Sequence, residues 1–104
     1  MTIKNIEATE LAVLLKEDKA LLIDVREPNE YAKEHIEGAE LFPLSSFNPA
    51  ALPEPGMRQI VFHCAGGIRS AKAVEACQKA GFAFEAHLKG GLQAWKASGL
   101  PTKK

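Results

Sequence analysis

The clearest signal along the chain is the alternation of continuous apolar runs with segments of helical spacing. Two runs, at residues 20–25 (ALLIDV) and 59–63 (QIVFH), have the length and content of strands buried on both faces of a sheet. A short edge strand is predicted at residues 41–44, because Pro43 is tolerated at the rim of a sheet but not in a central ladder. A fourth strand is predicted at residues 82–87.

The segments between these runs place apolar residues at helical spacing. Helices are predicted at residues 9–16, 28–35, 70–80 and 91–98. Residues 45–56 hold three prolines and one glycine, so we expect a loop there with no more than one helical turn. Strands that alternate with helices on short connections are typical of βαβ units. The pattern therefore predicts an α/β fold with a mainly parallel sheet, helices on both faces, and ligands at the carboxyl ends of the strands.

Composition indicates an ordinary globular protein. Apolar residues make up 46% and charged residues 25% of the 104 residues, which is a typical size for one domain. The formal net charge is zero, so the sequence lacks the basic surface that a nucleic-acid partner would need, although a small local anion site stays possible.

Neither the N-terminus nor any apolar run resembles a targeting or membrane-spanning segment. We therefore expect no membrane partner and a cytoplasmic location, provided that no targeting segment has been removed. The two cysteines could form at most one disulfide, and reduced thiols are the better expectation.

One loop carries the residues best suited to chemistry. In the string QIVFHCAGGIRSAKA, a buried strand brings Cys64 to its carboxyl end and a helix begins a few residues later. Unpaired N–H groups and the dipole at a helix N-terminus favour thiolate over thiol. Gly66 and Gly67 lack a β-carbon, so this backbone can turn its N–H groups inward, and Arg69 adds a positive charge. The sequence therefore predicts an anion-binding loop around a reactive thiol.

Three segments resemble the rhodanese family. CAGGIR with the following SAKA is similar to its active-site loop and helix, LLIDVREPNEYAKEHIEGA to its upstream signature, and LKGGLQAW to its downstream signature. The segments occur in family order across almost the whole chain. Glu34 departs from the family, which usually has glycine there, and we expect it to affect a loop rather than catalysis.

The resemblance implies a rhodanese-like three-layer fold with a mainly parallel five-stranded sheet, in one domain over residues 1–104. It also implies a persulfide intermediate on the catalytic Cys64, with no separate cofactor. The backbone amides implied to bind the transferred sulfur are those of Ala65, Gly66, Gly67, Ile68 and Arg69. In this family a loop of six residues, as here, goes with sulfur substrates, whereas one residue more goes with phosphatases and arsenate reductases.

Each of the two cysteines could have a structural role and not a catalytic one. Cys64 could be a buried structural thiol, but its place at a strand end beside glycines and Arg69 favours a reactive one. A side chain sealed in the interior, or loop amides turned away from it, would contradict the assignment. Cys77 lies well along the predicted helix from Ser70, too far from Cys64 for a disulfide, so we expect it in the core.

The remaining polar candidates have supporting roles at most. Asp24 and Arg26 end a neighbouring strand and could form a structural ion pair, which we favour, or help to bind an anion; Ser70 is a further supporting candidate. His63 should point to the opposite face of its strand from Cys64 and so is not its base. The other residues expected to pack or lie at the surface are His35, His87 and Trp95. No spacing of histidines and cysteines indicates a metal site.

We therefore expect a sulfurtransferase that moves a sulfane sulfur from a donor such as thiosulfate to cyanide or a thiol through a persulfide on Cys64. The partners would be a small anionic sulfur donor and a cyanide or thiol acceptor, the latter carried on another protein or free. A second hypothesis is a persulfide relay or protein-interaction module in sulfur trafficking, whose loop would look the same. A phosphatase or arsenate reductase is disfavoured by the loop length, and an inactive scaffold by the presence of Cys64.

Overall fold

The computed structural model describes residues 2–104, which form an α/β fold around one sheet. Its five strands, all parallel, lie in the order β1-β5-β4-β2-β3. They are β1 (Lys4–Ile6), β2 (Ala20–Asp24), β3 (Glu40–Leu41), β4 (Gln59–His63) and β5 (Ala86–Leu88). The two apolar runs of the sequence form β2 and β4, which pair over their full length at the middle of the sheet. This confirms the predicted fold class.

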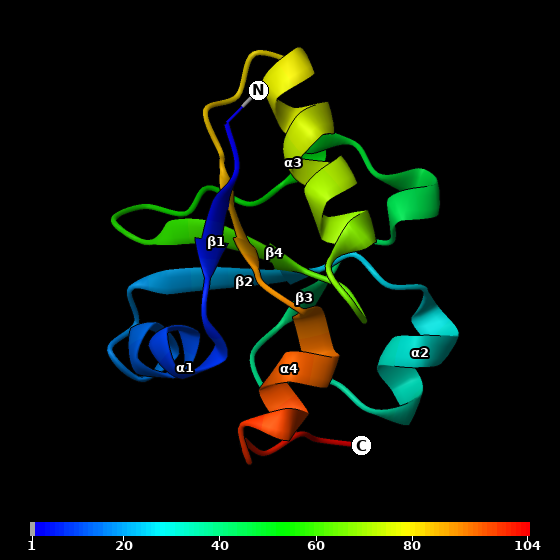
Figure 1. Ribbon diagram of the computed structural model, residues 1–104. Coiled ribbons are helices and arrows are strands. Elements are labelled where there is room, and N and C mark those ends of the chain that lie inside the picture. The colour runs from blue at the N-terminus through cyan, green and yellow to red at the C-terminus, as the bar shows by residue number, and fades with distance from the viewer. Residues whose placement is uncertain (1) are drawn as a thin grey trace.

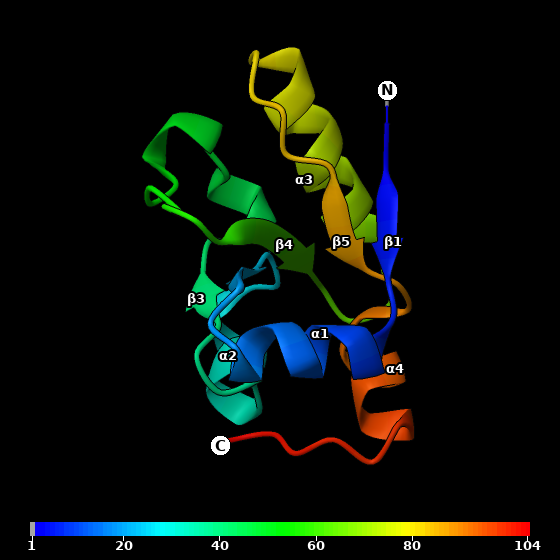
Figure 2. The ribbon, with the colours of Figure 1, turned by 90° about the vertical axis from the view of Figure 1, so that its left-hand side faces the viewer.

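Helices cover both faces of the sheet (Figure 1). The α-helices are α1 (Ala8–Lys16), α2 (Pro28–Lys33), α3 (Ile68–Lys79) and α4 (Gly91–Ala97). Helices α1 and α4 pack together below the sheet in Figure 1, whereas α3 lies above it, and the view in Figure 2 shows the same separation. None of the helices in residues 2–104 has the length and apolar content needed to cross a membrane.

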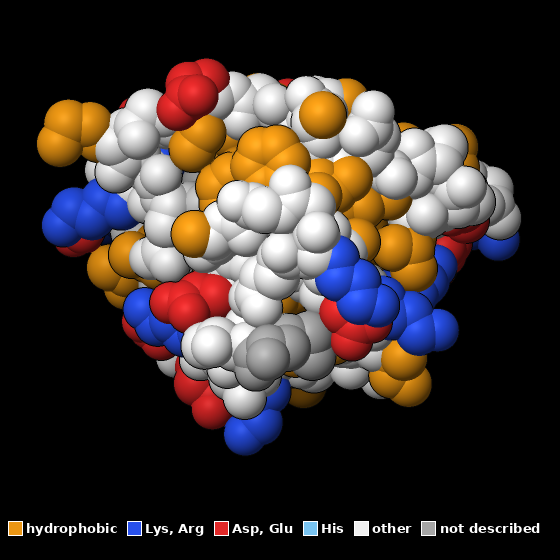
Figure 3. All heavy atoms as spheres, turned by 90° about the horizontal axis from the view of Figure 1, so that it is seen from above, with side chains coloured by type: hydrophobic (Ala, Val, Ile, Leu, Met, Phe, Trp, Pro, Cys, Tyr) orange, Lys and Arg blue, Asp and Glu red, His pale blue; other side chains and the backbone are white. Residues whose placement is uncertain are grey.

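Each face of the sheet has its own hydrophobic core, because successive side chains of a strand point to opposite faces. Leu22 and Val61 face α1 and α4 and pack there with Trp95, whereas Ile23 and Phe62 face α3. The α3 side also carries the connection between β3 and β4, whose half-buried aromatic and aliphatic side chains cover the core. Figure 3 looks onto this side and shows hydrophobic side chains gathered among charged ones. Cys64 belongs to the α3 side of the sheet.

The edges of the sheet differ from the sequence expectation. β1 was not predicted, because the three residues KNI carry no apolar pattern and the strand exists only through its pairing with β5. β5 occupies Ala86–Leu88 and not residues 82–87, because Phe82 and Phe84 stack on each other and pack toward α3 instead of joining the ladder. β3 is two residues long and begins at Glu40, one residue earlier than predicted.

The ends of two helices and one loop differ as well. α2 stops at Lys33 and not at His35, because Glu34 adopts an extended backbone and its carbonyl accepts a 2.7 Å hydrogen bond from Arg26. α3 begins at Ile68, two residues earlier than predicted. The proline-rich loop holds two short 3-10 helices where at most one turn was expected, η1 (Leu44–Ser46) and η2 (Pro49–Ala51).

Candidate functional site

Cys64 lies directly after β4 and four residues before the start of α3 (Figure 1). The chain turns sharply between these elements, and Gly67 occupies the N-cap position of α3 with φ of +109°. A residue with a β-carbon is strained at this backbone angle, which explains a glycine here. The loop therefore places the thiol in front of the N-terminus of α3, as the sequence predicted.

The sulfur atom of Cys64 receives backbone hydrogen bonds from two residues of this turn. The N–H of Gly67 lies 3.0 Å from Sγ, and the N–H of Ser70 lies 3.3 Å from it. The hydroxyl oxygen of Ser70 is 3.7 Å from Sγ. These donors are groups that the first turn of a helix leaves without an intrahelical partner, and they stabilise a negative charge on sulfur.

These contacts change the acidity of the thiol. Burial of Cys64 by itself raises its pKa. The hydrogen bonds from the backbone and hydroxyl of Ser70, together with the backbone N–H groups of Gly67 and Gly66, outweigh burial and leave the pKa below its ordinary value. Cys77 has no such donors, and burial raises its pKa to about 11. Of the two thiols, Cys64 is therefore the one whose surroundings favour the thiolate.

The burial of Cys64 differs from what the sequence assignment required. We expected the thiol to lie open at the mouth of the loop, but only 1% of the residue is exposed. It lies beneath a turn in which Gly66 is exposed while Ala65 and Gly67 are half-buried. Among the loop amides that the resemblance implied, those of Gly67 and Gly66 act on the sulfur, whereas those of Ala65, Ile68 and Arg69 are not among its donors. The expectation that these amides face the thiol is therefore met in part, and the expectation that the thiol is open is not met. A reagent can reach Sγ only if this turn moves.

The start of α4 holds the first residues of the loop in place. The N–H groups of Leu92 and Gln93 donate to the carbonyls of Cys64 and Ala65 over 2.8 and 3.1 Å. Gly91 packs so closely that a β-carbon there would lie 2.4 Å from the carbonyl oxygen of Cys64. Gly91, the first residue of α4, thus helps to set the position of the thiol.

Arg69 does not contact the sulfur in this conformation. Its guanidinium donates two hydrogen bonds, of 2.7 and 3.0 Å, to the carboxylate of Glu30 on α2. The Glu30 carboxylate also accepts the N–H of Glu27 at the start of α2. The bonds from Arg69, partly opposed by burial, lower the pKa of Glu30 to about 2, so the pair is charged at neutral pH. Sequence reasoning did not identify Glu30, because nothing local signals a contact between residues 39 positions apart.

Asp24 and Arg26 form the ion pair that the sequence favoured. Three side-chain hydrogen bonds of 2.8 to 3.1 Å join the guanidinium to the carboxylate, and both side chains are buried. The Nε2 atom of His63 lies 3.4 Å from the same carboxylate and has no hydrogen-bond partner. Burial raises the pKa of Asp24, but the proximity of His63 and the hydrogen bonds from Arg26 outweigh it and hold that pKa well below its usual range.

The sequence matches the rhodanese-like domain family over residues 7–98. The chain belongs to this family. It is 44% identical over 94 residues to an uncharacterized protein of Synechocystis sp., covering 90% of this chain and 52% of that protein. It is 47% identical over 81 residues to the probable adenylyltransferase/sulfurtransferase MoeZ of Mycobacterium tuberculosis, covering 74% of this chain and 20% of that protein. The chain thus spans about half the length of the first relative and a fifth of the second.

A solved structure supports the same fold. The rhodanese-related protein of Thermoplasma volcanium superposes with a TM-score of 0.82 and 29% identity, covering 96% of this chain and 97% of the other. The three-layer rhodanese-like architecture is therefore established on both sequence and structure.

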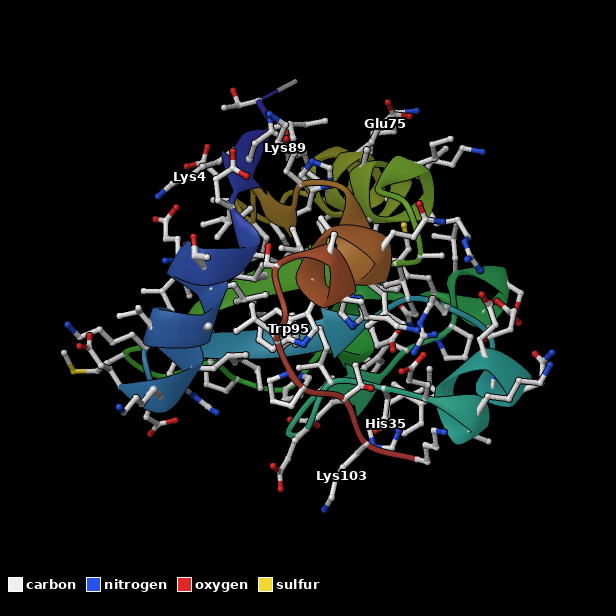
Figure 4. The ribbon with its side chains drawn as sticks, turned by 60° about the horizontal axis from the view of Figure 1, so that its bottom comes forward. Lys4, His35, Glu75, Lys89, Trp95 and Lys103 are labelled. Carbon is white, nitrogen blue, oxygen red and sulfur yellow. The ribbon has the colours of Figure 1, made fainter. Side chains whose placement is uncertain are left out.

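Other side chains of this rhodanese-like domain are placed as the sequence predicted. Cys77 is fully buried on the α3 side and both cysteines are free. His63 contacts Asp24 and so lies on the opposite face of the sheet from Cys64. Figure 4 shows Trp95 turned in beneath α4, where its indole N–H donates to the carbonyl of Pro101. Glu34 joins α4 to the C-terminal segment through Lys96 and Thr102, away from the loop.

Two residues near the rhodanese-like loop have contacts that the sequence did not indicate. His87 was expected to be an ordinary packing residue, but its Nδ1 atom lies 2.8 Å from the hydroxyl of Ser70. Its Nε2 atom lies 2.8 Å from the side-chain oxygen of Asn5 on β1. Because residues 5, 70 and 87 come from three separate elements, only the pairing of β1 with β5 reveals the connection. Among residues 2–104, no three potential metal-ligating side chains gather in one place.

Proposed function

We propose that this rhodanese-like domain is a sulfurtransferase in which Cys64 carries the transferred sulfur as a persulfide. The observation that carries the proposal is the pair of backbone N–H groups, from Gly67 and Ser70, that point at Sγ of Cys64. They stabilise sulfur as an anion both before attack and when it departs again. Membership of the rhodanese-like domain family and the similarity to a probable adenylyltransferase/sulfurtransferase support this reading.

The proposed reaction has two displacement steps. In the first, the Cys64 thiolate attacks the outer sulfur of a donor such as thiosulfate. A sulfur–sulfur bond to Cys64 forms, the donor's sulfur–sulfur bond breaks, and sulfite leaves with the electron pair. In the second, cyanide or a thiolate attacks the outer sulfur of the persulfide and Cys64 leaves as thiolate. The two steps transfer one sulfur atom from donor to acceptor and need no oxidant, reductant or separate cofactor.

The buried position of Cys64 requires one further step. The reacting state is one in which residues 65–67 move away from Sγ, so that the donor sulfur reaches it and the amides then close around the persulfide. Gly66 and Gly67 permit such a movement because glycine has a wide range of backbone angles. We propose that the loop amides of residues 65–69 and the Ser70 N–H bind the outer sulfur once the turn has opened.

A Cys64→Ser variant tests the proposal directly. Wild-type protein treated with thiosulfate should gain about 32 Da, one sulfur atom, and lose it again on addition of cyanide. Cys64→Ser should show neither the mass gain nor thiocyanate formation, whereas the matched Cys77→Ser control should show both. Persulfide formation by Cys64→Ser, or its absence from wild type with every donor, would refute the assignment.

A second candidate function is a relay that accepts sulfur from another protein and uses free thiosulfate poorly. Two observations favour it: Arg69 is neutralised by Glu30 and is therefore not free to attract a dianion, and Ile68 at the turn is 75% exposed. An exposed apolar side chain beside a reactive thiol suits contact with a protein surface. Comparing initial rates with thiosulfate and with a persulfide-carrying cysteine desulfurase separates the two functions, since a relay should be faster with the protein donor.

A further inference from the structure

The thiol of Cys64 is connected to the edge of the sheet by a chain of polar side chains. From Sγ it is 3.7 Å to the Ser70 hydroxyl oxygen, and from there 2.8 Å to Nδ1 of His87. Cys64 and Ser70 are at most 1% exposed, and His87 is 7% exposed. Polar groups buried in this way interact strongly, because little water competes for their hydrogen bonds. The site just described makes no use of His87.

The outer end of the chain determines which nitrogen of His87 carries the proton. Nε2 lies 2.8 Å from Oδ1 of Asn5, an oxygen that can only accept a hydrogen bond, so Nε2 is protonated. In the neutral ring, Nδ1 is then an acceptor, and at 2.8 Å from the Ser70 hydroxyl oxygen it is a closer acceptor for the hydroxyl proton than the Gly67 carbonyl at 3.2 Å. The hydroxyl oxygen is left with its lone pairs available for the S–H of Cys64. Each donor therefore meets an acceptor along the chain from Cys64 to Asn5.

We propose that His87 is a positioning residue that receives, through the Ser70 hydroxyl, the proton released by Cys64. The S–H bond breaks as its proton passes to Oγ of Ser70, and the original hydroxyl proton passes to Nδ1 of His87. The thiol and neutral imidazole become a thiolate and an imidazolium, with no net gain or loss of protons. The reversed hydroxyl then donates to the thiolate. Asn5 is exposed at the sheet edge, so the imidazolium can return its proton to solvent there.

This inference deepens the proposed sulfur transfer by explaining how a sealed thiol loses its proton. While the turn covers Cys64, water does not reach a residue that is 1% exposed, and His63 is on the other face of the sheet. Burial lowers the pKa of His87, so at neutral pH the imidazole is neutral and its Nδ1 is free to act as an acceptor, although burial also makes the ring a weaker base.

Charged side chains on the elements around His87 are turned away or already paired. On α3, Arg69 pairs with Glu30 and Glu75 with Lys79, while Lys72 is exposed. On β1, Lys4 alternates with Asn5 and so lies on the other face of its strand. After β5, Lys89 pairs with Glu7 at 3.8 Å. Figure 4 shows Lys4, Lys89 and Glu75 at the surface. Cys64 is thus the titratable group to which His87 is linked through the Ser70 hydroxyl.

The test follows the ultraviolet absorbance of the Cys64 thiolate against pH, which needs no access of a reagent to the sulfur. A Cys77→Ala background leaves one thiol. His87→Asn keeps an acceptor near the Nδ1 position but cannot take a proton. It should therefore raise the apparent pKa of Cys64 and reduce the thiolate fraction at neutral pH by about tenfold. Ser70→Ala should act in the same direction, and the double variant should be no worse than Ser70→Ala alone.

Asn5→Asp, at an exposed position, should shift the pKa of Cys64 in the direction opposite to His87→Asn. A carboxylate beside Nε2 favours the imidazolium, so it should lower the apparent pKa of Cys64 through the chain, whereas simple repulsion between negative charges would raise it. His35→Asn, at a histidine that is stacked on Tyr31 and bonded to Tyr31 and Lys103 but not to Cys64 or Ser70, is the matched control and should change nothing. Should His87→Asn fail to fold, the sign of the Asn5→Asp shift decides.

The inference is overturned by an unchanged Cys64 titration in His87→Asn, by a raised pKa in Asn5→Asp, or by additive effects of Ser70→Ala and His87→Asn. Its failure is distinct from failure of the proposed function. Persulfide formation by wild type is measured by mass and does not depend on which residue accepts the proton. Conversely, the titration shifts are measured without any sulfur donor.

Discussion

Arg69 stands in the loop that surrounds Cys64, yet its guanidinium is bound by the carboxylate of Glu30 at 2.7 and 3.0 Å. The pair holds α2 against the start of α3 and removes one positive charge from the mouth of the loop. Both side chains remain about one-third exposed, so solvent weakens the pair but does not dissolve it. The balance between Arg69 and Glu30 therefore bears on which sulfur donors the site accepts.

Glu30→Gln should improve the use of thiosulfate. Without the carboxylate charge, Arg69 is free to attract a dianion. The attraction of one charge near the surface is worth about 1 kcal/mol of donor binding, so the KM for thiosulfate should fall about fivefold. Steady-state thiocyanate formation measures the change. Glu37→Gln is the control, because Glu37 is an exposed carboxylate that pairs with Lys103 and not with a residue of the loop. A thiosulfate KM that stays the same in Glu30→Gln would mean that Arg69 does not take part in donor binding.

Gly91→Ala should displace the first residues of the loop. A β-carbon at this position would lie 2.4 Å from the carbonyl oxygen of Cys64, and the backbone φ of +60° is itself strained for alanine. We expect a loss of about 2 kcal/mol or more in urea unfolding together with slower persulfide formation. Gly99→Ala separates the effect of the close contact from the effect of the positive φ. Its φ is +77° but no atom lies within 4 Å, so it should lose only about 1 kcal/mol and keep its activity.

Asp24→Ala should destabilise the fold strongly. It leaves the guanidinium of Arg26 buried without its carboxylate, a change that typically costs about 3–5 kcal/mol. Urea unfolding measures the loss. Glu17→Ala breaks the exposed pair with Lys19 and should cost less than about 1 kcal/mol. Equal losses in the two variants would show that the buried pair has no special role.

Stability should fall in acid for a reason that two carboxylates share. Bonds from Arg69 lower the pKa of Glu30 from 4.5 to about 2, and His63 together with Arg26 outweighs burial and lowers the pKa of Asp24. A lowered folded-state pKa means that the stabilisation is complete above the ordinary pKa and is lost as the pH falls below it. The free energy of unfolding should therefore decline below about pH 4.5, and Glu30→Gln should decline less steeply between pH 4.5 and 2. Parallel curves for the two proteins would contradict the assigned pKa of Glu30.

The parts of this protein that the sequence determined are those with a local cause. The apolar runs of β2 and β4 indicate a doubly covered sheet whatever surrounds them, and two glycines between a strand and a helix bring the N–H groups of the turn toward Cys64. The loop, its thiol and the family resemblance could all be read from neighbouring residues.

Tertiary structure alone decided the contacts between residues far apart in the chain. β1 forms only by pairing with β5, and that pairing brings Asn5 to His87, and His87 to Ser70. Folding also sealed Cys64 beneath its own loop, through the packing of Gly91 against its carbonyl, and paired Arg69 with Glu30. Burial and charge pairing depend on the whole packed arrangement, whereas strand and helix patterns depend on a few successive side chains, and for that reason only the latter can be read from the chain itself.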